Sequence, residues 1–106
     1  MPKYMFQASY TTQGTKGLMK DGGSQRRAVI DDMLRGLGGR LEAFYFAFGG
    51  ADVYSIAELP DAVTGAALSL AINQSGAVRL TTVPLLTPEE MDQAAKKAVG
   101  YRPPGK

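Results

Sequence analysis

The stretch from Arg40 to Glu58 constrains the fold of this chain most strongly, because it reads as two β-strands joined by a glycine turn. It holds three of the four phenylalanines and two of the five tyrosines of the chain. Aromatic runs separated by glycine are typical of a β-hairpin, and a two-residue turn at Gly49-Gly50 sets Tyr45 opposite Tyr54. The densest apolar part of the chain is therefore predicted to form one hairpin.

Both faces of this hairpin are apolar. A small antiparallel sheet with one face in water alternates apolar and polar residues, and this hairpin does not. Helices of the same chain can cover one face, and a second copy of the chain is the simplest cover for the other. The sequence therefore predicts a homodimer or a higher homo-oligomer. One face carries Phe44, Phe46, Phe48, Val53 and Ala57, and the other carries Leu41, Ala43, Tyr45, Ala47, Asp52, Tyr54 and Ile56.

Hydrophobic periodicity and capping residues predict two further strands and three main helices. After the first strand, glycines limit the chain to a short helical turn, capped by Thr11 or Thr12, with Leu18 and Met19 facing inwards. The predicted strands run from Lys3 to Tyr10 and from Ala77 to Leu86, the second of them at an edge. The helices are capped at Ser24, Asp61 and Thr87 and end near Leu37, Gln74 and Gly100.

Each main helix has an apolar stripe that is predicted to face the sheet. The last helix also has a strong start, because Thr87 and Glu90 form a capping box around Pro88 at the first helical position. The stripes are Ile30, Met33, Leu34 and Leu37 in the first helix, Val63, Ala66, Ala67, Leu70 and Ala71 in the second, and Met91, Ala94, Ala95 and Ala98 in the third.

The main elements therefore follow the order β-α-β-β-α-β, with an added C-terminal helix. That order is the ferredoxin-like split unit, an α+β fold in which two helices cover one face of a four-stranded antiparallel sheet. Two such sheets packed face to face give a dimeric α+β barrel, and the doubly apolar hairpin favours that assembly. We expect a single domain over residues 1–99 and a Pro/Gly-rich tail over residues 100–106.

Composition excludes several classes of site. The chain of 106 residues contains no Cys and no His, which excludes disulfides, thiolate nucleophiles, imidazole bases and Cys/His zinc sites. Its carboxylates are too sparse for a metal cage, and no glycine run matches a nucleotide-binding motif. We therefore expect neither a metal nor a cofactor.

The charge pattern argues against two kinds of partner. The net charge is only +2 and the basic residues are scattered, so neither nucleic acid nor a membrane surface is expected as a partner. The adjacent pairs Arg26-Arg27 and Lys96-Lys97 are each explained by a solvated helix face. Since there is no apolar run of about 18 residues and no signal peptide at Met1, a cytoplasmic location is expected.

The hairpin also resembles a known family. The run Gly38-Gly39-Arg-Leu-Glu-Ala-Phe-Tyr-Phe-Ala-Phe-Gly-Gly-Ala-Asp52-Val, followed by Glu58-Leu-Pro-Asp61, resembles the GYD domain family. The first strand from Tyr4 and the Leu85-Leu-Thr-Pro-Glu-Glu-Met91 ending are similar to it as well. The resemblance covers nearly the whole chain and implies a ferredoxin-like, dimeric α+β barrel.

The family is named for a Gly-Tyr-Asp turn. Gly50 and Asp52 match that turn, whereas Ala51 stands at the position of the tyrosine. A role that depends on the tyrosine ring is therefore absent or moved, with Tyr45 and Tyr54 as its nearest replacements. The family has no established activity, so the resemblance implies a fold and a site location and not a reaction.

Asp52 is the candidate catalytic residue. If this carboxyl is buried among apolar neighbours, its pKa rises and it can act as a general acid or base, or anchor a ligand. Alternatively, Asp52 accepts backbone N–H groups of the turn and fixes the hairpin.

Tyrosines and one arginine are the candidate ligand-binding residues. The tyrosines could line a cleft and orient a small aromatic or enol-like ligand, although a buried tyrosine usually only packs. Arg79 could neutralise an anionic ligand, or form an edge-strand ion pair. Glu42 and Glu58 are expected on opposite faces of the hairpin, so they are not expected to act together as a catalytic carboxylate pair. Salt bridges with Arg40 or Arg79 are expected instead. The ligand-binding candidates are Tyr4, Tyr45, Tyr54, Gly50 and Arg79, with Tyr10 also considered for the cleft.

Three functions remain open. The first is a homo-oligomeric protein that binds a small organic ligand near the hairpin. The second is a cofactor-independent enzyme that acts on a small organic substrate by proton transfer or monooxygenation. The third is a structural or interaction module without a ligand. An enclosed cavity of about 300 Å³ or more that touches Asp52 would favour the first two, and a fully packed interior would favour the third.

Overall fold

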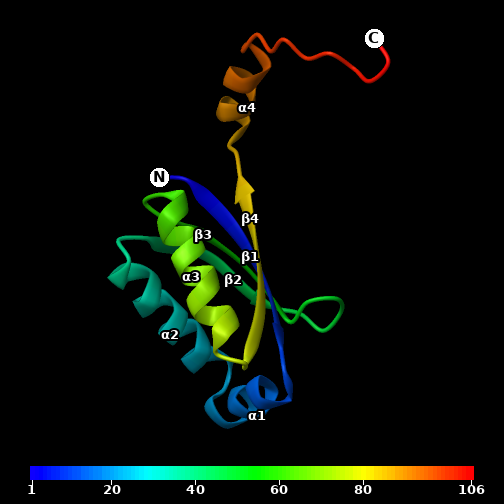
Figure 1. Cartoon of the computed structure of the whole chain (residues 1–106). Coiled ribbons are helices and arrows are strands. Elements are labelled where there is room, and N and C mark those ends of the chain that lie inside the picture. The colour runs from blue at the N-terminus through cyan, green and yellow to red at the C-terminus, as the bar shows by residue number, and fades with distance from the viewer.

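A four-stranded antiparallel sheet forms the centre of the protein, as a computed structural model describes it over residues 1–106 (Figure 1). The strands lie in the order β2-β3-β1-β4, and this is an α+β fold with four helices. The predicted succession of elements is confirmed, with one helix more than expected between the first two strands. The strands are β1 (Lys3–Tyr10), β2 (Arg40–Phe46), β3 (Val53–Glu58) and β4 (Val78–Leu85). The helices are α1 (Thr12–Asp21), α2 (Gly23–Gly36), α3 (Ala62–Gln74) and α4 (Pro88–Ala95).

The central strand β1 pairs with β3 on one side and β4 on the other. Its alternating side chains Tyr4, Phe6 and Ala8 are buried beneath helices, since α2 and α3 both cover the same face of the sheet (Figure 1). We call this the helix face and the other the open face. Strand β4 lies at an edge, as predicted. The core on the helix face consists of Tyr4, Phe6, Leu34, Ala57, Leu59 and Leu68, continued by Ala8, Val53 and Val78.

The hairpin pairs as predicted but turns differently. Tyr45 lies opposite Tyr54, as expected. The two-residue turn was wrong, because β2 ends at Phe46 and residues 47–52 form a longer loop. The backbone N–H of Ala47 donates to the carbonyl oxygen of Asp52 over 2.8 Å and closes this loop. Phe48 is consequently fully exposed instead of packing across the hairpin.

A β-bulge in β2 changes which side chains share a face. The register shifts between Leu41 and Ala43, so Leu41 lies opposite Ala57 and packs against the core of the helix face. The sequence had placed Leu41 on the face of Tyr45. One extra residue in a strand reverses the alternation beyond it, and the hydrophobic pattern carries no mark of that insertion.

Helix α3 faces the sheet with a different stripe from the predicted one. Gly65 and Leu68 are buried, whereas Val63 and Leu70 are 79% and 72% exposed. This helix carries no charged residue and its apolar residues are spread around its circumference, so its periodicity does not identify the inner face. A Cβ atom at Gly65 would lie 3.7 Å from the ring of Tyr4, so an alanine could be accommodated at this position.

The remaining helices agree with the sequence at their capped ends. Asp61 and Thr87 cap α3 and α4 as predicted, and α2 packs through its predicted stripe. However, α2 begins one residue before Ser24, and α1 is a full helix of ten residues. Gly14 in α1 lies so close to the carbonyl group of Ala77 that a side chain would collide with it, which explains a glycine inside a helix.

Helix α4 does not cover its own sheet. It projects away from the other elements, with the tail beyond it, and no residue of it is buried (Figure 1). The prediction that Met91 and the alanines of its stripe face the sheet was therefore wrong. The helix also ends at Ala95, earlier than the Gly100 that the sequence suggested.

A glycine where β2 begins provides a test of the packing. A Cβ atom at Gly39 would overlap the carbonyl oxygen of Glu58 and lie 2.9 Å from Leu59 Cδ2. We expect Gly39→Ala to lower the free energy of unfolding by about 1–3 kcal/mol in urea titrations. Gly65→Ala is the control, since its Cβ would lie 3.7 Å from Tyr4 and alanine favours a helix by up to about 1 kcal/mol. Equal stability of Gly39→Ala and the native protein would contradict this packing.

Candidate functional site

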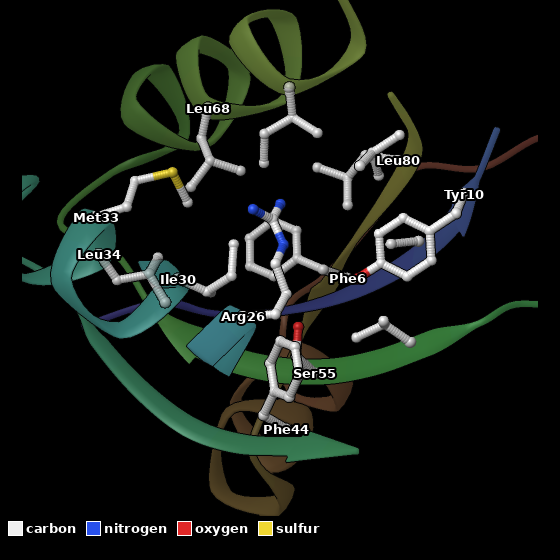
Figure 2. A pocket seen from close by; sticks show the side chains of 14 residues that line it. Phe6, Tyr10, Arg26, Ile30, Met33, Leu34, Phe44, Ser55, Leu68 and Leu80 are labelled. Atoms are coloured by element: carbon white, nitrogen blue, oxygen red, sulfur yellow. The ribbon is translucent and has the colours of Figure 1, made fainter. Parts of the chain in front are cut away.

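An apolar cavity of about 40 Å³ lies between α2, α3 and the helix face of the sheet. Twelve of the fourteen residues that line it are hydrophobic (Figure 2). Three polar groups interrupt this lining: the guanidinium of Arg26, the hydroxyl of Tyr10 and the hydroxyl of Ser55. Such a site, largely apolar with a few polar groups that converge on it, is typical of a small-molecule pocket.

The cavity exists because a small residue occupies the middle of the sheet. Ser55 on β3 lies directly opposite Phe6 on β1 and opposite Phe44 on β2. Its side chain is only 6% exposed and is much smaller than its two neighbours. Two large rings that flank a small side chain leave a gap under the helices, and no motif in the sequence marks Ser55.

Arg26 is the only charged residue that lines the cavity. It comes from the first turn of α2, and its side chain reaches in among the apolar groups instead of pointing into water (Figure 2). The sequence had explained Arg26 as part of a solvated helix face, and that interpretation was wrong. Its spacing of four residues before Ile30, on the inner stripe of α2, was the signal that could have placed it.

Tyr10 stands where the cavity opens outward. A groove of about 470 Å³ beneath α1 shares Tyr10, Arg26 and Ile72 with the cavity, so it forms the mouth of the pocket. Burial raises the pKa of the Tyr10 phenol, and the nearby Arg26 guanidinium partly opposes that rise. The phenol therefore stays protonated at neutral pH and can donate a hydrogen bond to a ligand at the neck of the pocket.

Asp52 lies outside the cavity. Its Oδ2 accepts a hydrogen bond from the backbone N–H of Tyr10 over 2.8 Å, and its own N–H donates to the carbonyl oxygen of Ala8 over 2.8 Å. The carboxylate thus joins the hairpin loop to the end of β1. It borders an open groove of about 360 Å³ that also touches Tyr10 and Phe46. The apolar cavity does not touch Asp52 and is much smaller than the 300 Å³ expected of a cavity there.

The other sequence candidates are divided between the two faces of the sheet. Tyr54, Arg79 and Gly50 come together on the open face, where they border a groove of about 370 Å³. Tyr45 pairs with Tyr54 on that face and is 72% exposed. Tyr4 lies on the helix face, buried in the core. The structure therefore brings three of the candidates together and separates them from both Asp52 and Tyr4.

The acidic residues near the open end of the hairpin form an ion cluster. Lys3 Nζ lies 2.9 Å from Glu42 Oε2 and 3.2 Å from Glu58 Oε1, and Arg40 also pairs with Glu58 at 3.1 Å. The hydrogen bond from Lys3, aided by Arg40, holds the pKa of Glu58 below its usual range. The predicted pairing with Arg40 is confirmed. The prediction that the two glutamates lie on opposite faces was wrong, because the bulge turns Glu42 towards Lys3.

A family comparison covers most of this structure. The model of the GYD domain matches residues 4–95, a span that includes all of the strands and helices except the first residue of β1. The chain belongs to the GYD domain family. No curated protein and no solved structure matches it.

This GYD domain offers no metal centre. No group of three or more acidic, histidine or cysteine side chains is arranged to hold a metal ion. None of its helices is both long enough and apolar enough to cross a membrane. The polar groups that line the pocket are those of Arg26, Tyr10 and Ser55, set among apolar side chains.

The role of Asp52 can be measured through stability. Asp52→Ala leaves the backbone N–H of Tyr10 without its acceptor, and we expect a loss of about 1–3 kcal/mol in urea unfolding. Asp52→Asn should lose less, since its amide oxygen can still accept the hydrogen bond. Asp32→Ala, at an exposed position on α2, is the control. If Asp52→Ala were as stable as the control, the carboxylate would not be fixing the hairpin loop to β1.

Proposed function

We propose that this GYD domain is a homo-oligomeric protein that binds a small, mostly apolar organic molecule between its helices and its sheet. The observation that carries this proposal is the apolar cavity at Ser55, with Tyr10 and Arg26 at its neck. Core positions of a purely structural domain gain most from being filled, because a cavity costs stability. A gap that opens into a groove beside two polar groups is better explained by a ligand.

The dimensions support a ligand that spans two compartments. The inner cavity of about 40 Å³ has room for only a compact apolar group, whereas the mouth of about 470 Å³ has room for the remainder. Pockets for small molecules typically measure about 300–1,000 Å³. Met33 borders both compartments, and its flexible side chain can adjust to a bound group.

Binding is favoured over proton-transfer catalysis. A general base in this pocket needs a group that accepts a proton near neutral pH. Tyr10 has a raised pKa and so remains protonated, and the carboxylate of Asp52 lies outside the cavity, bonded to backbone. The guanidinium of Arg26 does not accept protons at all. The pocket therefore contains donors that hold a ligand and no base that would transform it.

The open face of the sheet supports self-association. Helices cover only one side, and the open side carries Met5, Ile56 and Val83 in register across three neighbouring strands. Tyr54, opposite Gln7 of β1, extends this surface. Packing two open faces together gives the dimeric α+β barrel of ferredoxin-like units and removes this apolar surface from water.

The cavity can be closed by one substitution. We expect Ser55→Val to fill the gap between the two phenylalanine rings and to weaken binding of small neutral probes, such as benzamide, about tenfold or more. Ser55→Ala, which removes the hydroxyl but not the space, is the matched control and should keep most of the affinity. Binding is followed by the methyl NMR signals of Met33 and Leu68, which line the cavity. Unchanged methyl signals across a panel of small organic probes would refute the proposal.

The oligomeric state tests the open face separately. We expect a dimer or larger species at micromolar concentration in sedimentation velocity or light scattering. Ile56→Asp places a charge in the middle of the open face and should shift the protein to monomer. Val29→Asp, which alters an exposed apolar residue of α2, is the control and should leave the assembly intact. A native protein that is monomeric at micromolar concentration would refute self-association through this face.

A further inference from the structure

Arg26 lies in the first turn of α2, at the end of a helix where a positive charge is least favourable. The exposed N–H groups of the first turn give a helix N-terminus a partial positive charge, which favours acidic residues. Helix α2 has no acidic residue in its first turn and carries Arg26 there. None of the four salt bridges of the chain includes Arg26. This guanidinium therefore enters an apolar site without a carboxylate partner and beside a second source of positive potential.

The Tyr10 hydroxyl complements this guanidinium. Both groups line the neck between the enclosed cavity and its mouth, and Arg26 is near enough to Tyr10 to influence its ionisation. Arg26 can only donate hydrogen bonds, and the protonated phenol donates one more. Two donors of this kind, backed by an apolar wall, match the oxygens of an anion better than they match a neutral group.

We propose that the ligand of this pocket is a small organic monoanion, namely a carboxylate with a compact apolar body. Its carboxylate binds between the Arg26 guanidinium and the Tyr10 hydroxyl, and an apolar group such as a branched alkyl or a ring edge enters the cavity towards Ser55. This inference rests on the proposed function, because it names the class of ligand for the same pocket. It makes Arg26 the residue that determines specificity.

The mouth limits the charge of the ligand to one. Asp21 lines the mouth together with Arg26, and Asp52 borders the adjoining groove on the other side of Tyr10. A second carboxylate on the ligand, extending outward from the neck, would approach these acidic side chains and be repelled. A monocarboxylate places its single charge at Arg26 and leaves uncharged atoms in the mouth.

Matched acid and amide pairs test this inference. Benzoate is compared with benzamide, and isobutyrate with isobutyramide, because each pair differs in charge while shape and size are nearly equal. Binding is measured at neutral pH from the methyl NMR signals of Met33, Leu68 and Ile72. We expect each acid to bind about tenfold or more tightly than its amide, as charge-assisted hydrogen bonds are about twice as strong as neutral ones.

Substitutions at two adjacent arginines test which residue causes the preference for acids over amides. Arg26→Gln should reduce the acid-to-amide ratio to about one, whereas Arg27→Gln, at an exposed position of the same helix, should leave the ratio unchanged. Arg26→Lys keeps the charge and should retain part of the preference. In the native protein, the preference for acids should decline as the pH falls through about 4, where carboxylic acids become protonated.

The outcomes separate the two proposals. If acids and amides bind the native protein equally, the pocket binds small molecules and the anion inference is overturned. If Arg26→Gln keeps the full preference for acids, Arg26 is not the specificity residue and the inference is again overturned. If no probe of either kind shifts the cavity methyl groups, the proposed function itself fails, and the inference fails with it.

Discussion

The packing of β1 under two helices is the constraint on which the rest of this GYD domain depends. This strand is paired on both edges, so its backbone hydrogen bonds are satisfied within the sheet and its side chains decide the layers. Tyr4, Phe6 and Ala8 all point to one face and are buried there. The helices α2 and α3 must cover that face, and the opposite face is left without a layer from the same chain.

The candidate pocket is a local departure from this packing. Phe6 is flanked by Ser55 instead of a large apolar residue, and Arg26 lines the cavity that results. A guanidinium that lines an apolar cavity is stabilised by an anionic partner. One small molecule with an apolar body and an acidic group would fill the cavity and pair with this cation.

The two faces of the sheet carry different surface features. The helix face encloses the cavity, while the open face brings Tyr54, Arg79 and Gly50 around a shallow groove. Asp52 joins the two at the loop, because its carboxylate holds Tyr10 at the neck of the pocket while Gly50 and Ala51 of the same loop border the groove.

The sequence alone determined the four strands, three of the four helices and their order, because strand alternation and helix caps are local. The side chains of Asp61 and Thr87 accept hydrogen bonds from N–H groups three residues away, so their roles can be read directly from the chain. Only the tertiary structure decided the bulge at Glu42, the inner face of α3 and the inward course of Arg26. Each of these depends on contacts between segments far apart in the chain, such as Lys3 with Glu42, and no local pattern records them.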